Sequence, residues 1–146
     1  MRRSRRERQT PITAAGRATA TVAVFACAAS AGAHAGLVPE HLREAPRLGA
    51  AFVVSVVLLA IAGAALAIRP DSRRVARATA LLLAGLIAAY AAARTTGIPL
   101  LAPEPEAADG VGLATKLVEA AGLACALWLS QPAGGLRSSA SQEVPR

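Results

Sequence analysis

Four apolar stretches alternate with short polar segments along the chain, and each stretch has about 20 residues, the length of a membrane-spanning helix. They cover residues 18–38, 48–68, 75–93 and 111–131. An α-helix rises about 1.5 Å per residue, so each stretch is long enough to cross a hydrocarbon core of about 30 Å. The pattern predicts an all-α fold: an antiparallel bundle of four transmembrane helices in residues 18–131, with tails at 1–17 and 132–146.

Proline and capping residues indicate where these helices end. Pro39 follows the first span and suits the first turn of a short helix, Glu40 to Ala45, which Pro46 ends. We expect this short helix to lie along the outer membrane surface. Asp71 or Ser72 can cap the third span, which predicts a tight hairpin after the second. The tail 132–146 has the composition of a disordered segment.

Arginine is distributed unevenly between the loops, which predicts the orientation. Ten arginines precede the first span or separate the second from the third: Arg2, Arg3, Arg5, Arg6, Arg8, Arg17, Arg69, Arg73, Arg74 and Arg77. The other two connections contain only Arg43, Arg47 and Arg94. The positive-inside rule therefore places both termini in the cytoplasm of a multi-pass plasma-membrane protein. The net charge of +7 sits at membrane edges, so we expect no nucleic-acid partner.

The N-terminus has a second interpretation. Basic residues, an apolar run and Ala33-His34-Ala35 before Gly36 also resemble a secretory signal with its cleavage site. Cleavage after Ala35 would leave three spans. The sequence leaves this alternative open.

Polar residues near the expected outer surface form the only group that suggests chemistry. They are His34, Glu40, His41, Glu44, Arg94, Thr95, Thr96, Lys116 and Glu119. His41 and Glu44 are three residues apart and share a helical face, and His34 lies near the outer end of the first span. Imidazole and carboxylate groups suit a divalent metal, which makes His34, His41 and Glu44 candidate ligands. The alternative is a pair of interfacial histidines that hydrogen-bond to backbone carbonyls.

Glu119 lies about two turns inside the fourth span, where an ionisable side chain is costly and usually faces other helices. Lys116 is three residues earlier on the same face, and Arg94 is at the outer end of the third span. Two interpretations follow. Glu119 and Arg94 lock the third and fourth helices together, or the cluster forms a ligand pocket or proton pathway that opens outward.

Small residues four apart occur in every span, and such strips allow helices to approach closely in lipid. The pairs are Gly32 and Gly36, Ala60 and Ala64, Gly85 and Ala89, and Gly122 and Ala126. They are compatible with a tight monomer, a homo-oligomer or a partner membrane protein. Cys27 and Cys125 are expected to be free thiols within the bilayer. Tyr90 and Trp128 are expected to anchor the protein at the two interfaces.

No nucleophile with a base, paired acidic motif or phosphate-binding glycine loop is present in the sequence. With 54% hydrophobic and 3% aromatic residues, the chain suits a lipid bilayer better than a water-soluble core. The sequence therefore predicts no catalytic residue and no cofactor. The favoured function is a structural or accessory membrane component, and the alternative is an outer-face ligand or metal binder that uses the polar residues near the outer surface.

Several short motifs give the chain a family resemblance. They are His34 to Phe52 with both histidines, Pro39, Glu44 and Gly49-Ala50-Ala51-Phe52, then Arg94-Thr95-Thr96-Gly97-Ile98-Pro99, and Glu119. In these the chain resembles small uncharacterised four-helix integral membrane proteins of high-GC actinobacteria. The resemblance implies four uncleaved spans and an outer segment shared by the family. It implies no reaction.

Overall fold

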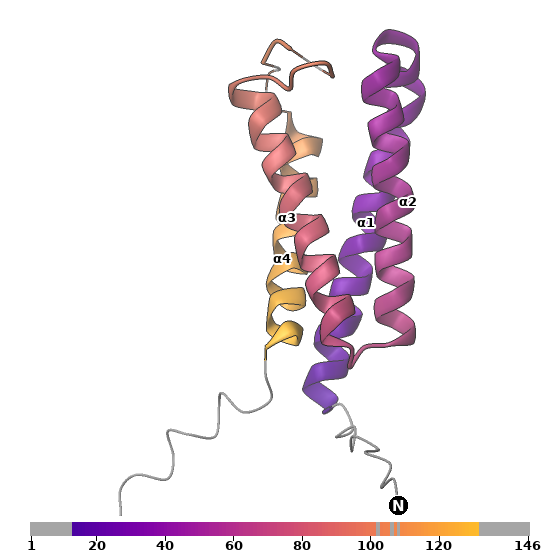
Figure 1. Ribbon diagram of the computed structural model, residues 1–146, viewed down its shortest axis with the longest axis vertical. Helices are drawn as coiled ribbons and strands as arrows, with labels where there is room; N and C mark the ends of the chain where they lie inside the picture. Colours follow the sequence, from indigo (N-terminus) through magenta and orange to yellow (C-terminus); the bar gives the residue numbers. More distant parts are fainter. Residues whose placement is uncertain (1–12, 102, 106, 108, 132–146) are drawn as a thin grey trace, which may run out of the picture.

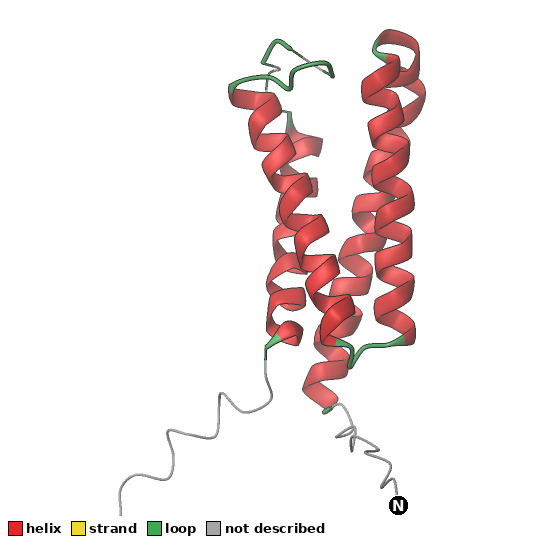
Figure 2. Ribbon diagram, viewed as in Figure 1, coloured by secondary structure: helices red, strands yellow, loops and turns green. Residues whose placement is uncertain are grey.

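Four long helices form the described part of the protein, for which we use a computed structural model covering residues 13–131 except 102, 106 and 108 (Figure 1). They are α1 (Ala14–Glu44), α2 (Pro46–Ile68), α3 (Arg73–Thr95) and α4 (Gly110–Ser130). The regular elements in these residues are all helical (Figure 2). Each helix is long and apolar enough to cross a membrane. The predicted all-α class and four apolar helices are confirmed, while most of the two predicted tails lies outside the described residues.

Polar side chains begin three of the helices. The hydroxyl of Thr13 accepts a hydrogen bond from Gly16 N, so α1 begins before the predicted residue 18. Ser72, one of the two predicted caps, accepts from Val75 N at the start of α3. Asp109 accepts from Gly112 N at the start of α4. Each cap satisfies a backbone N–H that would otherwise have no partner in the first helical turn.

The expected break in the first helix is absent, and the separate surface helix Glu40 to Ala45 is not formed. Residues 40–44 belong to α1, which continues through Pro39 for 31 residues. Proline removes one backbone hydrogen bond from a helix interior, but the end of α1 packs tightly on α2. A Cβ atom on Gly49 would lie 2.6 Å from the backbone nitrogen of Leu42. The helix therefore continues to a close contact with α2, and sequence rules that consider only neighbouring residues do not include such a contact.

The connections between successive helices differ in length: residues 69–72 join α2 to α3, whereas the longer segment 96–109 joins α3 to α4 (Figure 1). Only Ala45 separates α1 from α2. We call the end of the bundle with Ala45 and the α3–α4 loop the junction end, and the end with residues 69–72 the hairpin end. At the junction end α1 and α2 diverge from α3 and α4 (Figure 1). Throughout the described residues, α2 and α3 touch far less than α1 with α2, α1 with α4, or α3 with α4.

The core lies in the middle of the bundle and toward the hairpin end. One cluster joins Ala23, Leu66 and Ala76, and a second joins Cys27, Leu59 and Leu83. Gly122 of α4 fits between helices, since a Cβ atom there would lie 2.7 Å from the Cβ of Ala26 and 3.2 Å from Leu83 Cδ1. Small side chains thus let three helices meet closely at this level.

Of the four predicted strips of small residues, only that of Gly122 and Ala126 is buried in the bundle. Gly32, Gly36 and Gly85 are exposed, and a Cβ atom added to any of them would meet no neighbouring helix within 4 Å. Cys27 is buried, Cys125 is partly buried, and both are free thiols, as expected.

Candidate functional site

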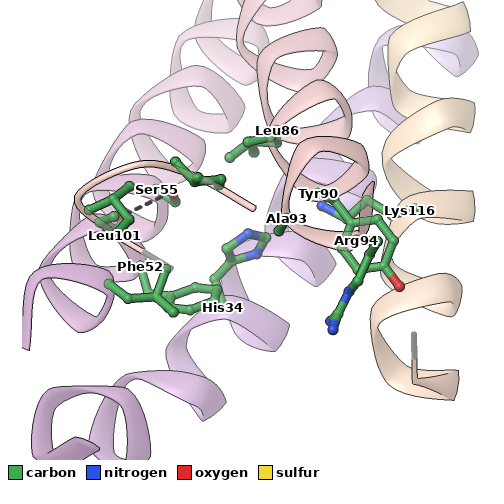
Figure 3. Close-up of a pocket in the computed structure, with 13 residues that line it drawn as sticks. His34, Phe52, Ser55, Leu86, Tyr90, Ala93, Arg94, Leu101 and Lys116 are labelled. Carbon is green, nitrogen blue, oxygen red and sulfur yellow. Dashed lines mark hydrogen bonds between the residues drawn. The ribbon is translucent and has the colours of Figure 1, made fainter. Parts of the chain in front are cut away.

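A cavity of about 150 Å³ lies near the junction end, between the α1–α2 pair and the α3–α4 pair (Figure 3). Its apolar wall includes Phe52 of α2, Leu86 of α3 and Leu101 of the α3–α4 loop. Its polar side chains are His34, Ser55, Tyr90, Arg94 and Lys116. The cavity therefore combines an apolar interior with hydrogen-bonding side chains from all four helices, a composition typical of small-ligand sites.

Glu119 is completely buried beside this cavity, and both of its carboxylate oxygens are bound. Ser30 Oγ of α1 donates to Oε1 at 2.6 Å. Lys116 Nζ, one turn earlier on α4, lies 2.5 Å from Oε2. Lys116, which the sequence places on the same helical face as Glu119, is thus its ion-pair partner. A buried carboxylate is tolerated where a counter-ion and hydrogen bonds replace water.

Arg94 does not pair with Glu119, so the predicted lock between α3 and α4 has other members. Its guanidinium donates to the carbonyl of Ala107 and, at 3.0 Å, to Asp109 Oδ2. Asp109 also caps α4 through Gly112 N at 2.7 Å. These bonds fix the end of α3 to the start of α4. The link made by Glu119 instead runs through Ser30 to α1.

Asp109 is exposed and lies just outside α4, where several donors stabilise its charged form. The backbone N–H of Gly112, and after it the guanidinium of Arg94, holds the pKa of Asp109 below its usual value. Hydrogen bonds and an opposite charge favour the carboxylate over the protonated acid. The aspartate therefore remains ionised to lower pH than a free aspartate.

His34 lies one turn from Ser30 on α1 and projects toward the cavity (Figure 3). Its Nδ1 is 2.9 Å from the carbonyl oxygen of Ser30 and 3.4 Å from the hydroxyl. Because a carbonyl can only accept, Nδ1 carries the hydrogen in that bond. His34 is 7% exposed, and its ring centroid lies 5.4 Å from that of Phe52. Ser30 thus contacts both His34 and Glu119.

Tyr90 lines the cavity and packs against the start of α4. The guanidinium of Arg94 lies 4.8 Å from its ring centroid, and Lys116 Nζ lies 5.4 Å from it. Both distances suit cation–π attraction. A Cβ atom on Gly112 would lie 2.8 Å from Tyr90 Cε2. Glycine at this position therefore allows the ring to pack against the first turn of α4.

The other predicted site residues lie away from the cavity. His41 Nδ1 is 2.9 Å from the carbonyl oxygen of Leu37. Its ring contacts Phe52, with the centroids 4.7 Å apart, and does not line the cavity. The hydroxyls of Thr95 and Thr96 donate to backbone carbonyls of α3. Glu40 and Glu44 are exposed near the end of α1.

The proposed metal ligands are not gathered into one group. His34 and His41 contact the same phenylalanine, and each Nδ1 faces a carbonyl of its own helix. Within residues 13–131, apart from the three gaps, no group of three or more histidine, cysteine or acidic residues is arranged to hold a metal ion. The bonds to backbone carbonyls fit the second interpretation of the two histidines.

Sequence reasoning missed Ser30, Tyr90 and Gly112 as parts of this site. Ser30 precedes His34 by four residues, and that helical spacing was the available signal. Comparisons of the chain with protein-family models, with curated proteins and with solved structures found no match.

Proposed function

We propose that the protein is a multi-pass plasma-membrane protein that binds a small ligand in the cavity at the junction end, without catalysing a reaction. One observation carries this proposal: four separate segments bring His34, Phe52, Tyr90 and Lys116 around one apolar space. A bundle evolved only for compactness would fill that space with side chains, because protein interiors are close-packed.

The proposed orientation places the junction end outside the cell and both termini in the cytoplasm, with the four helices antiparallel. The ten arginines near the hairpin end and the N-terminus support it, against three at the junction end. A reporter fused after Arg146 tests the arrangement. A reporter that is active only in the cytoplasm should be active at this position. Activity of a reporter that works only outside the cell would refute the topology.

Retention of the N-terminal segment is part of the proposal, as is the resemblance to four-helix actinobacterial membrane proteins. Cleavage after Ala35 would remove Ser30 and His34, which contact Glu119 and the cavity. The intact mass of the purified protein distinguishes the two forms. We expect the mass of the uncleaved chain.

Ligand binding can be tested without knowing the ligand. Ala93 lines the cavity, whereas Ala91 on the same helix is exposed and does not. Ala93→Leu should fill the space, and Ala91→Leu is the matched control. Mass spectrometry of solvent extracts should find a compound enriched with the wild type and the control but lost from Ala93→Leu. Identical extracts from all three proteins would contradict the proposed function.

A second candidate function is that of an accessory subunit that contacts a partner helix. Gly32 and Gly36 favour it, since they lie one turn apart on α1 and face away from the bundle with open space around them. The double variant Gly32→Leu/Gly36→Leu should then lose a partner that co-purifies with the wild type in fixed ratio. Unchanged co-purification would exclude these glycines as the contact.

A further inference from the structure

The charge of the cavity wall restricts the ligands that it suits. Its described lining residues include the basic side chains His34, Arg94 and Lys116, and no carboxylate. Arg94 is bound to Ala107 and Asp109. Lys116 has a flexible stem of four methylenes, and its side chain is 13% exposed. An ammonium has three N–H donors, so Lys116 can donate to a group in the cavity while it keeps its bond to Glu119.

The size of the cavity indicates that only part of a lipid fits inside. A space of about 150 Å³ holds a group about the size of benzene. A complete lipid with one alkyl chain is several times larger. The head end and first few carbons of such a molecule would fill the cavity, and the remaining chain needs a route out.

Among the helices that touch, α2 and α3 have the least mutual contact, and they provide that route. α2 and α3 form facing walls of the cavity, with Phe52 and Ser55 on one side and Leu86 and Ala93 on the other (Figure 3). Because α2 and α3 touch so little, this side is the weakest closure of the bundle. Both helices also carry exposed large apolar residues on their outer faces, such as Val57 of α2 and Leu81 of α3. A chain leaving here would pass the apolar lining residues of α2 and α3.

We propose that the cavity holds the head end of a single-chain anionic lipid from the outer leaflet, with Lys116 facing the headgroup and the chain leaving between α2 and α3. This inference rests on the proposed function and names the ligand class of that site. Charge complementarity selects an anion, and the apolar wall selects an amphiphile over a soluble ion.

The test uses the full-length protein in neutral maltoside detergent, with bound ligand measured by native mass spectrometry. The probes are palmitate, hexadecyl phosphate, hexadecanol and inorganic phosphate. Palmitate and hexadecyl phosphate should bind the wild type, and hexadecanol should bind about tenfold more weakly, a difference of about 1.4 kcal/mol. Inorganic phosphate should not displace palmitate.

Two variants, each with a control, distinguish binding of the headgroup from binding of the alkyl chain. Lys116→Gln should weaken palmitate binding by about tenfold with little effect on hexadecanol, while Arg77→Gln, an exposed cation at the other end of α3, should change neither. Ala93→Leu leaves the Glu119–Lys116 pair intact and should weaken both probes. Ala91→Leu should bind like the wild type. Ala93→Leu thus keeps the test valid if Lys116→Gln does not fold.

Several results would overturn the inference. Equal binding of hexadecanol and palmitate to the wild type would exclude an anionic class, although a neutral ligand of the cavity would survive as the function. Displacement of palmitate by inorganic phosphate would indicate a soluble anion. Palmitate binding that is unchanged in Ala93→Leu would exclude the cavity as the site. No binding of either anionic lipid would also refute the lipid class, whereas identical cellular extracts from wild type and Ala93→Leu would refute the function itself.

Discussion

The hairpin half and the junction half of the bundle are built on different principles. Toward the hairpin end, Ala23, Leu66 and Ala76 meet in a core with small side chains. Toward the junction end, His34, Lys116 and Glu119 surround or adjoin a cavity, and the two helix pairs diverge (Figure 1). Close packing in one half holds the helices in place, so the other half can remain partly open. The packed half is therefore expected to contribute stability alone, whereas Lys116 in the open half contributes to binding and, through its pair with Glu119, to stability.

The largest stability effect should come from Glu119, at the boundary of the two halves. Glu119→Gln leaves Lys116 without its counter-ion, and breaking a buried ion pair in this way costs about 3–5 kcal/mol. The double variant Lys116→Met/Glu119→Gln removes both charges and should recover most of the loss. Thermal unfolding in detergent, followed by circular dichroism, measures both. If the double variant were as unstable as Glu119→Gln, the unpaired charge would not be the cause.

A slightly smaller loss of stability is expected when a side chain is added in the packed core. Gly122→Val places a side chain where the Cβ alone would lie 2.7 Å from Ala26, and overpacking costs about 1–3 kcal/mol. Gly85→Val is the matched control, because a Cβ there meets nothing within 4 Å. Unfolding temperatures of the two variants should differ clearly. Equal temperatures would mean that the core tolerates expansion as well as the exposed face does.

Removal of the hydroxyl that links α1 to Glu119 should have a more modest effect. Ser30→Ala deletes the bond to Oε1, and hydrogen bonds between membrane helices contribute about 1 kcal/mol. Ser55→Ala is the control, since that hydroxyl donates to Ala51 O of its own helix. The same unfolding assay should find Ser55→Ala close to the wild type. A larger loss in Ser55→Ala would contradict the role assigned to Ser30.

The smallest expected effect on stability is the pH dependence that comes from Asp109. The pKa of Asp109 is lowered by Gly112 N–H and by Arg94. The folded protein therefore binds a proton here less readily than the unfolded chain, so this stabilisation is present above about pH 4 and is lost as the pH falls further. The unfolding temperature of the wild type should fall more between about pH 5 and pH 3 than that of Asp109→Asn, which keeps a good helix cap.

Glu104→Gln, a change at an exposed acid of the same loop, is the control for this titration and should follow the wild type. Parallel pH profiles for the wild type and Asp109→Asn would show that ionisation of Asp109, favoured by Gly112 N–H and Arg94, does not stabilise the fold.

Local rules predicted the features of this fold that have local causes. Apolar length predicted four helices, Ser72 was among the expected caps, and helical spacing placed Lys116 on the same face as Glu119, its partner in the structure. Features that depend on contacts between distant segments were not predictable in this way. The continuation of α1 through Pro39 accompanies the fit of Leu42 against Gly49. The partners of Ser30 and Tyr90 likewise depend on which helix faces meet, and hydrophobic pattern does not specify them.

The short spacing between Lys116 and Glu119 also has a consequence for how the protein enters a bilayer. Each charge alone opposes insertion of a helix by about 2.5–3.5 kcal/mol at its centre. Because both groups lie on successive turns of α4, they can neutralise each other before any other helix arrives. In the proposed membrane protein, α4 would therefore enter lipid with its two charges paired, and Ser30 of α1 would add its hydrogen bond only when the helices assemble.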